Sequence, residues 1–270
     1  MDSQAQCRTR QVQTRYLAPV EARAAPSYAD PRLEELRGEA MRRLFPKSRA
    51  GADRRRARVA LQLHAYLAEA GTIEDLERRL RVPLRYPMEL IDEVRLRDGR
   101  AVLVRPVLPS DAPLQRAFVR SMSTATRRNR FHGGVTDLPD AVLRYLTEID
   151  YVDHLALVGE ILDESGARQV AEGRWVRRRD EPERADFAIA IADDCQRGGL
   201  GNALLDRLQR SAAAKGIRRL CGHVLRTNHR MIGWLEARGW RIEPDADDPG
   251  VVCAELPLAT RAARQWRAAA

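Results

Sequence analysis

A glycine-rich turn is the part of this chain whose residue types and spacing are best suited to chemistry. It follows a predicted apolar strand over residues 186–192 and reads Gln196-Arg197-Gly198-Gly199-Leu200-Gly201 where a helical pattern begins. A helix start has unpaired backbone N–H groups and the positive end of the helix dipole. Gly199 and Gly201 have no Cβ, so a phosphate can approach these groups closely. The turn is therefore predicted to bind the phosphates of a ligand.

The order of the glycines argues against two common phosphate ligands. A dinucleotide-binding turn has the order G-x-G-x-x-G, and a nucleotide P-loop ends in Gly-Lys followed by Ser or Thr. Residues 196–201 have neither arrangement. We therefore expect neither a dinucleotide nor a nucleoside triphosphate at this turn.

Thiol and imidazole side chains offer other chemistry, but their spacing defines no site. Cys195 and Cys221 suggest a covalent acyl-enzyme, yet neither can be paired with a histidine and a carboxylate by spacing, so we favour buried, inert thiols. His223 alternates with Cys221 along a predicted strand, and it either lines a cleft or, as we favour, is a satisfied core histidine. The five histidines have no metal-ligand spacing, so no metal is expected.

The N-terminal third of the chain is predicted to be helical after a polar arm. Residues 1–30 lack periodicity, which indicates a poorly ordered arm. A short amphipathic helix is expected over 31–44, and a basic run over 49–58 is expected to be a loop and a solvated helix start. A helical stripe over 59–67 closes at Gly71, and Thr72 with Asp75 caps another short helix that ends at Leu80.

Residues 61–82 also resemble the first two helices of a helix-turn-helix, which would suit a chain with a net charge of +9. Pro83 and Pro87 stand where the recognition helix would lie. Proline inside a helix costs about 3 kcal/mol. We therefore predict that residues 31–87 form a small helical extension packed on the main domain, and we do not expect a nucleic-acid partner.

From residue 88 onward, strand and helix patterns alternate. This mixture predicts a single α/β domain over 88–258, followed by a tail, 259–270, that forms a short helix. Strands are expected at 101–107, 154–162, 169–177, 186–192, 220–225, 240–242 and 251–256, and helices at 110–122 (capped by Ser110), 138–146, 200–216 and 228–237. The helix that starts at Leu200 carries Leu204, Leu205 and Leu208 on the same face. The charged turn 178–184 is expected to be solvated.

The glycine-rich turn and the residues after it resemble the signature of the GNAT acetyltransferase superfamily. The residues that carry the resemblance are Gln196, Gly199, Gly201, Gly216-Ile217, Val224-Leu225, Asn228-His229-Arg230-Met231 and Gly239-Trp240. The resemblance covers about residues 100–256, and Arg105-Pro106 and segments 121–134 and 146–151 are similar to the GNAT domains of bacterial Pat-type protein-lysine acetyltransferases. It implies a mixed, mostly antiparallel central sheet flanked by helices.

The resemblance also implies acetyl-CoA as the cosubstrate, held mainly by backbone groups. Ile189, Ala190 and Ile191 would present backbone groups to the pantetheine arm where two strands separate. The amides that would hold the pyrophosphate are those of Arg197, Gly198, Gly199, Leu200, Gly201 and Asn202, which follow Gln196 in the loop. In the second cofactor element, which includes Met231, Asn228 would hydrogen-bond the cofactor arm, cap the next helix, or do both.

Acetyl transfer to an amine needs a base for the ammonium group and a donor for the thioester oxyanion. Pat-type domains have a glutamate where this chain has Asp186, which is therefore implied as the base, with a bridging water because its side chain is shorter. The other interpretation of Asp186 is a strand-edge carboxylate at a turn. Glu172 and Glu160 on neighbouring strands are the reserve bases. Many GNAT enzymes have a tyrosine that acts as general acid for the leaving thiolate where this chain has Leu235. Here the thiolate would leave unassisted or be protonated by water.

These observations predict an acetyl-CoA-dependent N-acetyltransferase that uses direct transfer in a ternary complex. The favoured acceptor is a protein lysine, and a small-molecule amine is the next candidate. The acidic loop 243–248 would attract a cationic amine, or it is a solvated turn. The alternative from another class is a noncatalytic acyl-CoA sensor whose basic extension binds a partner or DNA.

Composition and cysteine usage define the expected setting of the protein. The chain is 44% apolar, enough to bury a core, and no apolar run approaches the roughly 18 residues of a membrane span, so no membrane partner is expected. Its four cysteines form no C-x-x-C pair and no secretory hydrophobic segment precedes them. We therefore expect reduced thiols in a cytoplasm. The oligomeric state stays open.

Overall fold

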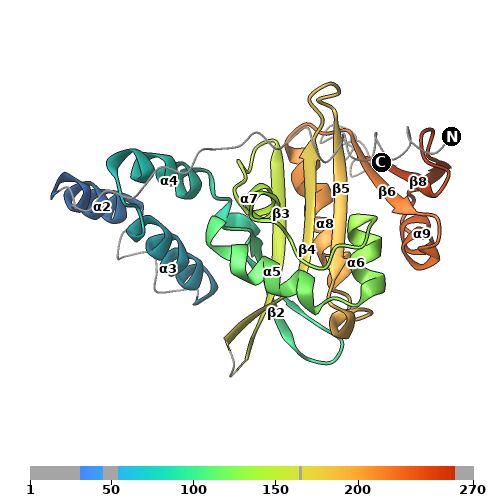
Figure 1. Ribbon diagram of the computed structural model, residues 1–270, viewed down its shortest axis with the longest axis horizontal. Helices are drawn as coiled ribbons and strands as arrows, with labels where there is room; N and C mark the ends of the chain where they lie inside the picture. Colours follow the sequence, from blue (N-terminus) through green and yellow to red (C-terminus); the bar gives the residue numbers. More distant parts are fainter. Residues whose placement is uncertain (1–30, 45–53, 164–165, 259–270) are drawn as a thin grey trace, which may run out of the picture.

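An eight-stranded sheet forms the centre of the protein (Figure 1). The computed structural model describes residues 31–44, 54–163 and 166–258. The strand order across the sheet is β1-β2-β3-β4-β5-β6-β8-β7. The strands are β1 (Asp92–Arg95), β2 (Ala101–Pro106), β3 (His154–Asp163), β4 (Gly166–Arg177), β5 (Arg184–Ile191), β6 (Arg219–Leu225), β7 (Arg241–Pro244) and β8 (Val251–Pro257). All neighbouring pairs are antiparallel except β5 and β6, so the expected mixed, mostly antiparallel sheet is confirmed.

Helices cover both faces of the sheet. The main-domain helices are α5 (Ala112–Ser121), α6 (Thr124–Phe131), α7 (Asp140–Thr147), α8 (Leu200–Ala214) and α9 (His229–Glu236). Successive residues of a strand point to opposite faces. Glu172 of β4 is bonded to Gln115 of α5, whereas a Cβ added at Gly173 would lie 2.9 Å from Leu208 of α8. Helices α5 and α8 therefore lie on opposite faces of β4.

The parallel pair β5 and β6 is short. Its ladder contains three residue pairs, the last of which joins Asp186 to Cys221. Beyond that pair β5 continues to Ile191 and β6 continues to Leu225, with no further ladder between them among the described residues. The two strands therefore separate toward the end of β5, from which the chain continues to α8 (Figure 1).

Helix α8 is amphipathic as predicted. Leu200, Leu204, Leu205 and Leu208 are all buried in the main hydrophobic core. The helix packs against β3, β4 and β5. Each such leucine contributes roughly 1.5–3 kcal/mol by burial, so the predicted apolar face fixes the helix whose first turn follows the glycines.

Within the described residues, three helices precede the sheet and lie to one side of it in Figure 1. They are α2 (Pro31–Leu44), α3 (Arg54–Ala68) and α4 (Ile73–Arg85). Leu33, Leu67, Ala70 and Leu76 form a small core of their own, while Val59 and Leu63 of α3 join the main core. Arg58 of α3 also lies 3.1 Å from the buried carboxylate of Glu160. The extension is therefore attached to the main domain by both apolar and ionic contacts.

Helix α4 begins where predicted and ends later. Thr72 accepts a hydrogen bond from the amide of Asp75 at 3.1 Å, which confirms the predicted cap. The predicted end at Leu80 is wrong, because the helix continues through Pro83 to Arg85. Leu80 packs on the small core and Val82 on the main core. These contacts offset the backbone hydrogen bond that proline cannot make.

Other differences from the sequence prediction are local. Strand β1 and helix α6 were not expected; both are short and weakly apolar. Ser110 does not cap α5, because a 3-10 turn over Pro109–Asp111 precedes that helix. Asp111 instead accepts hydrogen bonds from the amide of Leu108 and from Arg105, each at 2.7 Å.

The predicted arm, 1–30, the first part of the basic run, 49–53, and the tail, 259–270, lie outside the described residues. None of the helices within the described ranges combines the length and apolar composition that a membrane crossing requires.

Candidate active site

The glycine-rich turn makes a sharp entry into α8. Arg197 has a φ of 64° and Gly199 a φ of 96°, both in the left-handed region. Glycine adopts this region without strain, whereas an arginine pays a conformational cost. The helix starts at Leu200 directly after Gly199. The turn therefore connects the strand to α8 through two residues with left-handed backbone.

The amides of residues 197–202 have no protein acceptor within the described chain. The amide of Ala203 is the next one along, and it bonds to the carbonyl of Gly199 at 3.2 Å. Unpaired amides at the positive end of a helix dipole form a binding site for an anion. A Cβ added at Gly199 would meet no atom within 4 Å, so the space beside the turn is open.

Contacts from three other segments hold the turn in place. The side-chain amide of Gln196 donates to the carbonyl of Ile191 at 3.1 Å, and Arg230 of α9 donates to the oxygen of Gln196. The carbonyl of Gly198 accepts from the amide of Arg97 in the β1–β2 turn at 3.2 Å. The side chain of Arg197 is exposed. Gln196 therefore positions the turn through its side chain.

Helix α9 lies beside the start of α8. Asn228 caps α9 by accepting a hydrogen bond from the amide of Met231 at 3.2 Å. Asn202 accepts from the indole of Trp234 at 2.9 Å and from the guanidinium of Arg238. The predicted capping by Asn228 is therefore present, and Asn202 joins the two helices.

Ile189, Ala190 and Ile191 lie on the part of β5 that has left β6. Each is paired with β4 on one side, opposite Gly173, Glu172 and Ala171 in turn. Their other edge has no ladder partner among the described strands. Backbone groups on that edge are available to a ligand that lies between the two strands.

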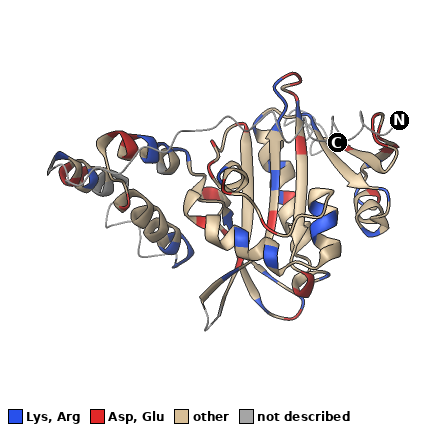
Figure 2. Ribbon diagram, viewed as in Figure 1, with Lys and Arg blue, Asp and Glu red and all other residues tan. Residues whose placement is uncertain are grey.

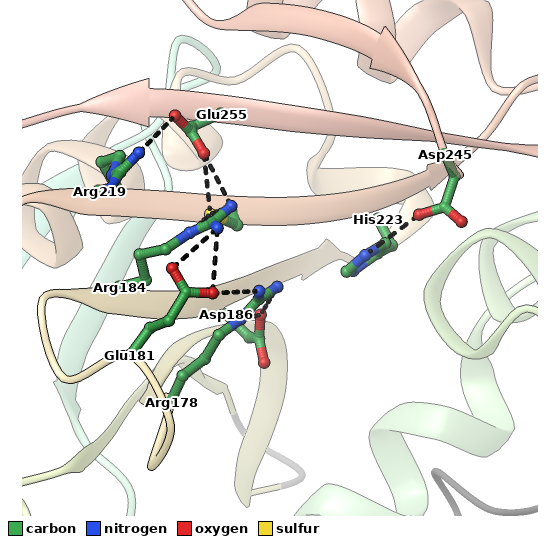
Figure 3. A network of polar contacts seen from close by, with 9 residues as sticks. Arg178, Glu181, Arg184, Asp186, Arg219, His223, Asp245 and Glu255 are labelled. Carbon is green, nitrogen blue, oxygen red and sulfur yellow. Dashed lines mark hydrogen bonds and ion pairs between the residues drawn. The ribbon is translucent and has the colours of Figure 1, made fainter. Parts of the chain in front are cut away.

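Asp186 is at the last parallel pair and is half exposed, with 51% of its side chain accessible. Its Oδ1 atom lies 2.7 Å from Nη2 and 2.8 Å from Nε of Arg178, which comes from the β4–β5 turn (Figure 3). That turn was expected to be solvated. Arg179, Asp180 and Glu183 in the middle of the turn are exposed as expected, whereas Arg178 and Arg184 at its ends are half-buried and contact Asp186, Glu181 and Glu255. The expectation is therefore wrong for these two arginines.

The two reserve carboxylates lie in buried ion pairs, and Figure 2 shows charged residues on the central strands. Glu160 contacts Arg105 and Arg58. Glu172 contacts Arg174, Arg130 and Gln115. Burial raises the pKa of Glu172, but the positive charges of Arg174 and Arg130 outweigh it and lower that pKa to about 2. These partners leave neither carboxylate free to take a proton from an amine.

Sequence analysis did not assign a role to a pair on β6 and the β7–β8 turn. His223 Nε2 lies 3.4 Å from Asp245 Oδ2 (Figure 3). The side chain of His223 is 43% exposed, so the expectation of a core histidine is wrong. The alternation of His223 with Cys221 and the acidic loop were the available signals. Sequence alone could not show that the loop folds back onto the strand.

Leu235 is buried in the core, so the position of the family tyrosine offers no proton. The hydroxyl of Tyr151 donates to the carbonyl of Val107 at 2.8 Å, and burial raises the pKa of Tyr151. The thiols of Cys195 and Cys221 are buried as predicted, and burial raises the pKa of each. Tyr151 is therefore not placed for proton transfer, and the thiols of Cys195 and Cys221 are not placed for nucleophilic attack.

Comparison with known proteins agrees with this geometry. A model described as Acetyltransferase (GNAT) family matches residues 141–240. Acetyltransferase PA5475 of Pseudomonas aeruginosa is 32% identical over 163 residues, which cover 60% of this chain and 87% of that protein. The fold, the splayed strands and the relatives together define an acetyltransferase, and the chain belongs to the GNAT family.

Two further relatives are of the Pat type. Acetyltransferase Pat of Mycolicibacterium smegmatis is 32% identical over 167 residues, and this chain spans only 48% of its length. The crystal structure of the GNAT domain of PAT from S. lividans matches with a TM-score of 0.58 and 28% identity, covering 64% of this chain and 99% of that domain. The similarity to Pat proteins is therefore to their acetyltransferase domain.

Proposed function

We propose that this GNAT acetyltransferase moves an acetyl group from acetyl-CoA to a primary amine by direct transfer in a ternary complex, with a protein lysine as the favoured acceptor. The observation that carries the proposal is the set of amides over residues 197–202, which have no protein acceptor in the described chain and stand beside the separated strands. The reduced state of the described cysteines fits a cytoplasmic setting.

The residues of the site fit acetyl-CoA. Its pyrophosphate would accept hydrogen bonds from the amides of 197–202, because an anion is stabilised at a helix N-terminus. The pantetheine arm would lie along the free edge of β5, where the backbone of Ile189, Ala190 and Ile191 is accessible. Asn228 and Met231 would border the arm from α9. When bound, the thioester supplies an activated acetyl carbonyl.

The acceptor side favours a cation. Glu181, Glu255 and Asp245 lie on the face of the sheet that also carries Asp186 (Figure 3). The turn between β7 and β8 adds Asp247 and Asp248. Asp186, Glu181 and Glu255 are paired with Arg178, Arg184 and Arg219, so the attraction for a positively charged amine comes from the acidic β7–β8 turn. Lysine, which carries an ammonium on a long flexible stem, meets this requirement.

The similarity to Pat-type domains supports a protein lysine over a small amine. The open side of the site supports it too, since His223 and Asp186 are both partly exposed. A small-molecule amine would satisfy the same charge requirement. The acceptor therefore needs a direct competition experiment.

The experiment supplies acetyl-CoA, a peptide with one internal lysine and a blocked N-terminus, the same peptide with arginine in place of lysine, and a set of small primary amines. Free CoA is measured by thiol titration, and acetylated products are identified by mass spectrometry. We expect one acetyl group on the lysine peptide for each CoA released, and none on the arginine peptide. Release of CoA only with small amines would overturn the lysine acceptor. Tight CoA binding without any transfer would favour the sensor alternative.

A further inference from the structure

His223 borders the point where β5 and β6 separate. It lies two residues beyond the last parallel pair, Asp186 with Cys221, and on the same face of the sheet as these two residues. A separation of two residues along a strand is about 6.6 Å. His223 is thus close to the start of the opening and, unlike the buried Val224 that follows it, reaches solvent.

The carboxylate of Asp245 is fixed beside this imidazole. Its Oδ1 atom accepts hydrogen bonds from the amides of Asp247 at 3.0 Å and Asp248 at 3.1 Å, which fix the carboxylate in the β7–β8 turn. Its Oδ2 atom is directed at Nε2 of His223, 3.4 Å away (Figure 3). The carboxylate is only 17% exposed. A carboxylate at this distance favours the tautomer that has its proton on Nε2, in which Nδ1 carries the lone pair.

Other charged and titratable groups face the same region from each packed element. On β6 and β8 they are Cys221, Cys253 and Glu255, and from the β7–β8 turn they are Asp245 and Asp248. The end of α6 adds His132 and Arg130. Arg184 and Asp186 come from β5, and Arg178 comes from the β4–β5 turn. Burial and the nearby His223 lower the pKa of His132. Glu255 is occupied by Arg184 and Arg219, and Cys221 by Arg184.

The three carboxylates expected from sequence are less suited to accept a proton. Glu160 and Glu172 are buried against arginines. Asp186 is bonded through one oxygen to Arg178. Among the described residues that border the opening on this face, His223 combines partial exposure with a carboxylate that orients it. This is the geometry of a general base with an orienting partner.

From this arrangement we infer that His223, oriented by Asp245, is the general base that deprotonates the acceptor ammonium. The inference rests on the proposed transfer to an amine. Nδ1 of His223 takes one proton from the ammonium, and the amine nitrogen then forms a C–N bond with the acetyl carbonyl carbon. The C–S bond breaks and its electron pair leaves with the sulfur. Of the two protons lost by nitrogen, one neutralises the thiolate and the other passes to solvent.

The test compares His223→Gln with His64→Gln, an exposed histidine on α3 far from the site along the chain. We expect His223→Gln to lower kcat/KM for the amine about 100-fold, within the range typical of a lost general base. CoA affinity, measured by calorimetry, should change less than twofold. The acid limb of the pH profile of kcat/KM should change, because the side chain that accepts the proton is gone. His64→Gln should match the unsubstituted enzyme in all three measurements.

Asp245→Ala gives a readout that does not depend on turnover. In the unsubstituted protein, 15N NMR of the imidazole should show His223 with its proton on Nε2. Asp245→Ala should give a mixture of tautomers, whereas Glu243→Ala, a change at a carboxylate of the same hairpin that pairs with Arg241, should not. A His223→Gln enzyme with unchanged kcat/KM and pH profile would overturn the inference and leave the proposed function intact. A protein that acetylates no amine would instead defeat the proposed function.

Discussion

Asp186 and Arg178 form an ion pair across the β4–β5 hairpin, with 2.7 Å between Oδ1 of the aspartate and Nη2 of the arginine. The pair places the guanidinium of Arg178 beside the carboxylate that the family resemblance implied as the base. Asp186 also belongs to the last parallel pair, where the opening that His223 borders begins. Asp186 and His223 are therefore alternative candidates for the general base, and the two assignments predict different effects of mutation on catalysis.

Asp186→Asn should lower kcat by no more than about threefold. The change removes no proton acceptor if His223 is the base, and the half-exposed ion pair that is lost contributes only roughly 0.2–1 kcal/mol to stability. Steady-state kinetics with a lysine peptide, together with CoA binding, measures the effect. If kcat falls 100-fold while CoA binding is kept, Asp186 rather than His223 is the base.

Glu160→Gln should destabilise the fold by about 3 kcal/mol. Glu160 contacts the fully buried Arg105 and ties Arg58 of α3 to the main sheet. Removal of one partner of a buried ion pair typically costs 3–5 kcal/mol because a charge is left uncompensated, and Asp111 retains part of the compensation for Arg105. Urea unfolding measures the loss. Glu93→Gln, which removes an exposed pair with Arg95, is the matched control and should change stability by less than about 0.5 kcal/mol.

The local parts of this structure were predictable from the sequence, and the long-range polar contacts were not. The leucine stripe of α8 and the cap at Thr72 depend on residues within a few positions of each other. The pairs Arg58 with Glu160 and His223 with Asp245 join segments that the chain brings together only after folding. Pro83 shows the converse case, since tertiary packing of Leu80 and Val82 overrides a local helix breaker.

The buried His154 should make stability depend on pH. Burial and the positive charge of Arg174 lower the pKa of His154 from 6.5 to about 3. The unfolded chain therefore binds more protons between these values, so this contribution to the free energy of unfolding is full above about pH 6.5 and falls as the pH drops toward 3. We expect His154→Gln to show a shallower loss of stability over this window, measured by urea unfolding at several pH values. Identical slopes for both proteins would contradict a neutral, buried His154.

Gly173→Ala should destabilise the contact between β4 and α8. The added Cβ would lie 2.9 Å from Cδ1 of the buried Leu208. Overpacking of a core commonly costs about 1–3 kcal/mol. Thermal unfolding checks this, with Gly134→Ala as the control because a Cβ there meets no atom within 4 Å. Equal melting temperatures for the two variants would show that α8 can shift without cost.

The central claim is that backbone amides at the start of α8 bind the pyrophosphate of acetyl-CoA. The most direct measurement is an NMR titration of the 15N-labelled protein with CoA and, separately, with pantetheine, which lacks the pyrophosphate. We predict that the amide signals of residues 197–202 shift on addition of CoA and stay in place with pantetheine. CoA binding that leaves these amide signals unmoved would contradict the account.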